Sequence, residues 1–218
     1  MKRSLREFFG SLPLAAQGYL LVLALSLPVA ALASFLRLLD LHAWTALVPA
    51  LVWQGQLWRL VTYAFLPSTP IDWFVSLFWS ATLVSLLARS WTGSRFWFYN
   101  LLCALGGALG FVLLKPNLQI GIVGCYAMIC GLLVAWDRFH RYERLLLLGI
   151  GEVSVRQAAI LIVSLNSLIM LFSAGGIALV SMWCGGLAGW IHFWWRERRL
   201  INRASQAAPS ERIARLEL

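Results

Sequence analysis

Cysteine and histidine are the residues best suited to nucleophilic or metal chemistry in this chain, and their spacing favours neither. There is no CxxC pair and no Cys/His spacing typical of a metal site. A buried thiol without a neighbouring base is inert, so we expect small apolar packing roles for Cys103, Cys125, Cys130 and Cys184. The three histidines (His42, His140 and His192) lie in loops or near a span end. We therefore expect no metal and no cofactor.

Polar side chains inside apolar segments are costly in a bilayer and are candidate functional residues. Ser164, Asn166 and Ser167 lie near the middle of one such segment. They could bond to neighbouring helices or to their own backbone, or they could form a polar patch that another protein's helix enters. Asp72 begins another segment, where a carboxylate can cap a helix and complement its dipole. Partnering Arg59 or the basic flank of a client is the alternative.

The elements that must position these residues are membrane helices. Of the 218 residues, 61% are hydrophobic and 12% charged, and the mean hydropathy is +0.77, which exceeds what a soluble domain can bury. Six segments approach the length that crosses hydrocarbon as a helix: residues 17–38, 71–88, 96–114, 120–136, 158–174 and 176–195. We predict an all-α membrane protein with a short N-terminus (1–16), a six-helix membrane domain (17–196) and a basic polar tail (197–218).

The basic residues predict the orientation. Of the 18 Lys and Arg residues, all except Arg37, Arg59 and Lys115 fall on one side of the six predicted spans. The positive-inside rule therefore places both termini in the cytoplasm. This explains the net charge of +9, and a nucleic-acid partner is not expected. The first apolar run is longer than the ~7–15 residues of a signal-peptide core, so we expect an uncleaved helix.

Two segments outside the spans have distinct expectations. Residues 40–70 carry three tryptophans, a residue type that prefers the membrane–water interface, so we expect one or two short interfacial helices there. The tail after residue 196 is polar, and we expect it to be mostly disordered. A short amphipathic helix near residues 210–217 that contacts anionic lipid is the alternative.

Several stretches resemble segments of the rhomboid intramembrane proteases, in the order in which that family has them. Residues 121–131 (Gly-Ile-Val-Gly-Cys-Tyr-Ala-Met-Ile-Cys-Gly) resemble the family's fourth transmembrane helix, and Trp58-Arg59 resembles the motif that opens its first loop. Residues 92–96, 106–110 and 185–189 resemble the turn into span three and the glycine faces of helices three and six. The resemblance implies a rhomboid-like bundle built around the motif residues Trp58, Arg59, Gly121, Gly124, Gly185 and Gly189.

The residues that would perform the family's chemistry are replaced. The nucleophilic serine falls at Val123, which has no oxygen, and the histidine base falls at Met182 or Trp183, depending on which glycine anchors the alignment. Asp72 and Ser76 take the places of a His and an Asn that hold the oxyanion. A carboxylate would raise the barrier there, because stabilising an oxyanion needs donors. The resemblance therefore implies a pseudoprotease and not an enzyme, since losing one member of such a unit removes most of the acceleration.

The expected function is to bind transmembrane segments of client or partner proteins without cutting them, for quality control or as an adaptor. Rhomboid substrates approach between spans two and five, so the resemblance assigns client binding to Trp73, Ser164 and Asn166. A fixed subunit of a larger membrane complex is the alternative, and an active protease or a transporter is less favoured. The expected partners are the lipid bilayer and transmembrane proteins. The compact loops favour a bacterial inner membrane.

Overall fold

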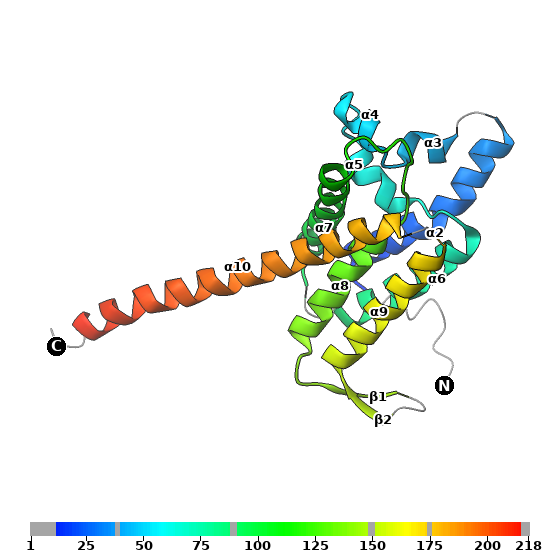
Figure 1. Cartoon of the computed structure of the whole chain (residues 1–218). Coiled ribbons are helices and arrows are strands. Elements are labelled where there is room, and N and C mark those ends of the chain that lie inside the picture. Colours follow the sequence, from blue (N-terminus) through cyan, green and yellow to red (C-terminus); the bar gives the residue numbers. More distant parts are fainter. Residues whose placement is uncertain (1–11, 38–39, 88–90, 148–150, 174–175, 215–218) are drawn as a thin grey trace.

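In the computed structural model, the structure describes residues 12–37, 40–87, 91–147, 151–173 and 176–214, and helices dominate them (Figure 1). Six longer helices form the body: α2 (Leu14–Phe35), α6 (Pro70–Leu87), α7 (Gly93–Leu114), α8 (Tyr126–Phe139), α9 (Val155–Ser173) and α10 (Ile177–Ala214). Short helices α3 (Leu41–Thr45), α4 (Pro49–Trp53), α5 (Arg59–Thr62) and η1 (Tyr63–Phe65) make up most of the first loop. The structure thus confirms an all-α bundle.

Among the described residues, four helices are long and apolar enough to cross a membrane: α2, α6, α7 and the part of α10 from Ile177 to Arg199. Helix α9 is apolar over a shorter stretch, Val155–Leu168. Helix α8 has 14 residues, about 21 Å of helix, against ~30 Å of hydrocarbon. The chain is therefore a multi-pass membrane protein, while the count of six spans and the cytoplasmic termini stay predictions.

Helix α8 lies at the centre of the bundle and packs against α6, α7, α9 and α10. Because neighbours cover most of its surface, nine of its residues are buried. The closest packing is between α10 and helices α7 and α8, where glycines replace side chains. A Cβ on Gly185 would lie 2.6 Å from the Ala127 Cβ and 2.8 Å from the Ala127 carbonyl oxygen. Such close approach is how membrane helices gain dispersion contacts.

The predicted span 120–136 is wrong over its first six residues, because α8 begins only at Tyr126. Residues 121–125 are not helical. Ile122 pairs with Leu47 of the first loop in an isolated β-bridge, with N–O distances of 2.9 and 3.1 Å. Gly124 has a φ of 126°, which only glycine adopts without strain. Non-helical backbone at membrane depth is tolerated where protein buries and satisfies it, and the first loop supplies that cover.

Two further elements differ from expectation. The segment predicted as a simple loop between α8 and α9 contains a β-hairpin, β1 (Arg144–Leu147) paired with β2 (Gly151–Ser154). The tail expected to be mostly disordered is helical to Ala214, and Figure 1 shows this end of α10 extending away from the other helices. Strong helix formers follow the apolar part and favour a continuing helix, although Pro209 lies within it.

Candidate functional site

The positions to which the resemblance assigns a catalytic pair lie in different surroundings. Val123 sits in the non-helical segment before α8. Met182 of α10 is 2% exposed and lines a small void beside Tyr126 and Asn166. Trp183 is 50% exposed and lines a separate groove between α9 and α10. None of the three can donate or accept the proton that hydrolysis needs.

A buried carboxylate, Asp72, organises the neighbouring polar residues. It is 7% exposed, and its Oδ2 accepts hydrogen bonds from the Ser68 backbone N–H and hydroxyl, both at 2.8 Å. Its Oδ1 accepts from the Ser76 hydroxyl at 3.3 Å and from the hydroxyl of Tyr126, the first residue of α8. We call Ser68, Asp72, Ser76 and Tyr126 the Asp72 centre. The carboxylate lies near the N-termini of α6 and α8, where helix dipoles favour negative charge.

The hydrogen bonds of Asp72 bear on two of the sequence interpretations of that carboxylate, while pairing with the basic flank of a client stays a prediction. Asp72 supports the start of α6 by bonding the backbone just before it, while the Thr69 hydroxyl accepts from the Asp72 N–H at 3.1 Å. The alternative pairing of Asp72 with Arg59 is wrong, because the Arg59 side chain donates its hydrogen bonds to Gln56, Ala43 and Ala46. Tyr126 was missed by sequence reasoning. It is 54 positions from Asp72, and no local pattern indicates such a contact.

Arg59 holds the first loop together. It is 5% exposed, and its Nη1 donates to the carbonyls of Ala43 and Ala46 at 2.8 and 2.7 Å, where α3 ends. Its Nε donates to the Gln56 side chain at 2.7 Å. A cation at a helix C-terminus satisfies orphan carbonyls and complements the dipole. The adjacent Trp58 stacks on Trp44, with ring centroids 6.3 Å apart.

The remaining motif glycines mark places of close approach. A Cβ on Gly121 would lie 2.9 Å from both Ala46 and Val48 of the first loop. On Gly124 it would meet the Tyr126 ring at 2.8 Å, and on Gly189 it would collide with Tyr99. Gly121 and Gly124 therefore let the segment before α8 pack closely against the first loop and the Tyr126 ring, and Gly189 lets α10 approach α7.

The three predicted client-binding residues do not share one surface. Trp73 donates its indole N–H to the Leu23 carbonyl of α2 at 2.8 Å. Asn166 is 8% exposed and donates to the Ile162 carbonyl of its own helix at 2.9 Å. Ser164 is exposed, and it opens onto a groove between α9 and α10 instead of the predicted face toward α6. The helical periodicity of α9 turns residues 164 and 166 to different sides.

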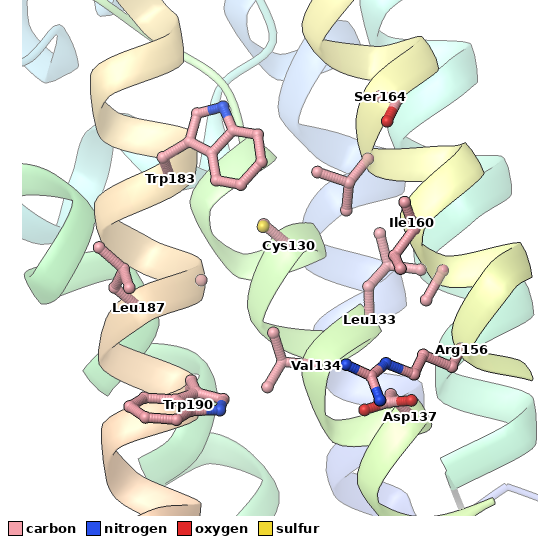
Figure 2. A pocket seen from close by; sticks show the side chains of 13 residues that line it. Cys130, Leu133, Val134, Asp137, Arg156, Ile160, Ser164, Trp183, Leu187 and Trp190 are labelled. Atoms are coloured by element: carbon pink, nitrogen blue, oxygen red, sulfur yellow. The ribbon is translucent and has the colours of Figure 1, made fainter. Parts of the chain in front are cut away.

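The groove has a volume of about 360 Å³. Figure 2 shows its walls and floor: Ile160 and Ser164 come from α9, Trp183, Leu187 and Trp190 from α10, and Cys130, Leu133 and Val134 from α8. Most of these side chains are apolar, and several are at least half exposed on the outside of the bundle. The groove therefore opens sideways, toward the place of the lipid. It runs along eight residues of α9, about 12 Å.

One end of the groove is charged. Asp137 of α8 and Arg156 of α9 both line it, and Figure 2 shows their side chains at the same end, beside Trp190. The Asp137 Oδ1 is buried, and within the described part of the chain it has no hydrogen-bond partner. A buried, unsatisfied carboxylate oxygen is costly. The Arg156 guanidinium lies at the same end of the groove (Figure 2), so the protein itself places a cation near this carboxylate.

Comparison with known proteins gives a family. Residues 18–211 match the family model described as Eukaryotic integral membrane protein (DUF1751). No curated protein matches the chain. The family's description overturns the expected bacterial inner membrane, which rested on compact loops. Loop length follows from how neighbouring helices connect, and it carries no information about the organism.

Proposed function

The chain belongs to this family of eukaryotic integral membrane proteins, and from that premise we propose that it is a non-proteolytic, rhomboid-like protein that binds transmembrane segments of other proteins. The observation that carries the proposal is the groove between α9 and α10. It is apolar, open to the side, and holds one hydroxyl and one unsatisfied carboxylate oxygen.

The Asp72 centre supports the non-proteolytic part of the proposal. Its carboxylate faces the place where an oxyanion would need donors, and the hydroxyls of Ser68, Ser76 and Tyr126 already donate to it. A developing negative charge there would meet repulsion in place of stabilisation. With valine at the nucleophile's place, binding without cleavage is the function that these side chains favour.

The groove supports the binding part. Transmembrane helices associate through packing and a few interhelical hydrogen bonds. The open groove offers both, with Trp183, Leu187 and Ile160 for packing and Ser164 for hydrogen bonding. The charged end, with Asp137 and Arg156, suits a client with a polar residue near the end of its span. The proposed client surface thus moves from the α6–α9 face to the α9–α10 groove.

Site-specific photo-crosslinking in native membranes tests this proposal. A photo-reactive residue is placed at Ser164 or Leu187, which line the groove. The matched positions are Leu165, which is 53% exposed on another side of α9, and Trp73, which bonds to α2. We expect a range of single-span or tail-anchored proteins to be trapped from the two groove positions and few from the other two.

Other outcomes decide between functions. One recurring, stoichiometric partner from every exposed position would identify a fixed subunit of a membrane complex, and the client-binding proposal would be abandoned. Reaction of the unaltered protein with a serine-directed activity probe would contradict the pseudoprotease part. Equal trapping from Leu165 and Ser164 would mean that the groove has no special role.

A further inference from the structure

A second pocket lies where the start of α7 meets the membrane part of α10. It measures about 390 Å³ and is lined by basic, polar and aromatic residues: Trp91, Ser94, Arg95, Phe98, Tyr99, His192, Phe193 and Arg196. Three of the eight are basic or imidazole side chains, and none is acidic. Nothing in the proposed client-binding function uses this pocket.

Within the described ranges, no ion pair neutralises the two arginines of the pocket. An ion pair joins Arg138 to Glu197 at 3.1 Å. Glu197 is therefore occupied, although it adjoins Arg196 in sequence. Arg95 and Arg196 are exposed and form no ion pair among the described residues. Two unpaired guanidinium groups on one pocket form a site for an anion with several oxygens.

The start of α7 adds to the positive potential. Ser94 and Arg95 lie in the first turn of this 22-residue helix, and the preceding Thr92 makes no side-chain cap hydrogen bond. The first backbone N–H groups of a helix have no intrahelical partner, and they carry the positive end of its dipole. They therefore reinforce the two arginines on the same side of the pocket.

The pocket's place in the bundle indicates which anion it suits. It lies at the ends of two candidate spans, Gly93–Leu114 and Ile177–Arg199, which is where lipid headgroups lie. Its walls are aromatic (Trp91, Phe98, Tyr99 and Phe193). Outside the pocket on α10, Arg198 stacks on Trp194 at 4.0 Å and Arg199 on Trp195 at 3.6 Å. A small soluble anion gains nothing from apolar walls. A phospholipid has both a phosphate, which the arginines can bind, and apolar chains, which the aromatic side chains can contact.

We propose that the Arg95–Arg196 pocket binds the headgroup phosphate of an anionic phospholipid, with the acyl chains lying along the outer faces of α7 and α10. Basic pockets between transmembrane helices are suited to anionic headgroups. The site is separate from the α9–α10 groove, because it uses α7 in place of α8 and α9.

Native mass spectrometry of the purified protein in detergent tests the site, with phosphatidylserine and phosphatidylcholine added in turn. We expect the unaltered protein to retain phosphatidylserine preferentially. Arg95→Gln and Arg196→Gln each remove one cation worth ~1 kcal/mol near a headgroup, which is about a fivefold loss of affinity. The double variant should lose about thirtyfold. Arg199→Gln is the matched control, because Arg199 stacks on Trp195 outside the pocket, and it should retain the lipid.

Three results would overturn the proposal. These are equal retention of the two lipids, a loss in Arg199→Gln as large as in Arg95→Gln, and displacement of the lipid by millimolar inorganic phosphate, which would indicate a soluble anion. The thermal midpoint of each variant in detergent separates binding from folding. Arg95 is exposed in the first turn of α7, so Arg95→Gln keeps the test valid if Arg196→Gln fails to fold.

Discussion

The Asp72 centre and the α9–α10 groove use different parts of the same helix and treat their polar groups in opposite ways. The Asp72 centre uses Tyr126 at the start of α8, and every hydroxyl in it donates to one carboxylate. The groove uses Cys130 to Asp137 further along α8, and among the described residues the Asp137 Oδ1 has no hydrogen-bond partner. A closed set of polar groups stabilises the bundle, whereas an unsatisfied group is available to another molecule.

This contrast indicates that the groove, and not the Asp72 centre, is the better candidate for binding another molecule. The place that resembles a catalytic centre is filled by the protein's own hydrogen bonds. The open surface lies along the far part of α8, where Ser164 and Trp183, both named from the resemblance for other reasons, line one groove. The following predictions test this contrast, from the largest expected loss of stability to the smallest.

Removing the Asp72 carboxylate should lower the free energy of unfolding more than any other change described here. Asp72→Ala leaves the hydroxyls of Ser76 and Tyr126 buried without an acceptor, and we expect the free energy of unfolding to fall by about 3 kcal/mol. Tyr126→Phe should cost about 1 kcal/mol. Reversible unfolding in mixed micelles measures both. In the double variant, the losses should be less than additive, since the two side chains share one hydrogen bond. Full additivity would contradict the Asp72 centre as a unit.

A control keeps that prediction specific. Asp40 is exposed, and it caps α3 by accepting from the Ala43 N–H at 3.2 Å. Asp40→Ala removes the same functional group from a solvated helix end and should cost no more than about 1 kcal/mol. A loss as large as that of Asp72→Ala would mean that any outer carboxylate is equally important.

Adding one methyl group to the α8–α10 contact should have the next largest effect. The new Cβ of Gly185→Ala would press on the backbone of Ala127, which cannot rotate away, so we expect a loss of about 2 kcal/mol. Gly18→Ala is the matched control, because a Cβ on Gly18 meets nothing within 4 Å. It should be neutral or stabilising, since alanine favours helix. Equal behaviour of the two variants would contradict the close packing.

The first-loop arginine should show a smaller, geometry-dependent effect. Arg59→Lys keeps the charge but cannot reach Gln56 and the carbonyls of Ala43 and Ala46 together. We expect a loss of about 1 kcal/mol and faster proteolysis between residues 40 and 60 in membranes. A lysine variant indistinguishable from the unaltered protein would mean that charge alone holds the loop.

Filling the groove should leave stability nearly unchanged. Ser164→Phe and Leu165→Phe both place an aromatic ring on an exposed part of α9, and each should alter the free energy of unfolding by less than about 0.5 kcal/mol. Ser164→Phe should block the groove, because Ser164 lines it, whereas Leu165→Phe should leave it open. A large loss from Ser164→Phe would show that the groove is part of the packed core.

The sequence predicted those features that depend on local composition. The length of the apolar runs predicted the ends of α6 and α7 to within a few residues, because a helix that crosses hydrocarbon must be continuously apolar. It misplaced the start of α8, where a β-bridge to Leu47 and the conformation of Gly124 override the apolar run. It missed the β-hairpin because residues 145–148 are all leucine and show no strand alternation.

In the candidate sites, too, the sequence predicted the local features and missed the contacts that depend on how helices pack. Asp72 was identified as a helix-start carboxylate, but its bond to Tyr126 depends on how α6 and α8 pack. Trp183 was named as a place for a lost histidine and instead lines the groove. Asp137 follows the predicted span 120–136 and Arg156 precedes the predicted span 158–174. Only the packing of α8 against α9 brings them to one end of a groove.

Photo-crosslinking from Leu187 in three backgrounds tests the central claim most directly, with a doubly tagged single-span protein as client. In the unaltered protein and in Leu165→Phe, we predict capture of the intact client with both tags. In Ser164→Phe, where a ring fills the groove opposite Leu187, capture should fall at least fivefold. Shortened clients, or capture that is equal in all three backgrounds, would contradict a groove that binds transmembrane segments without cutting them.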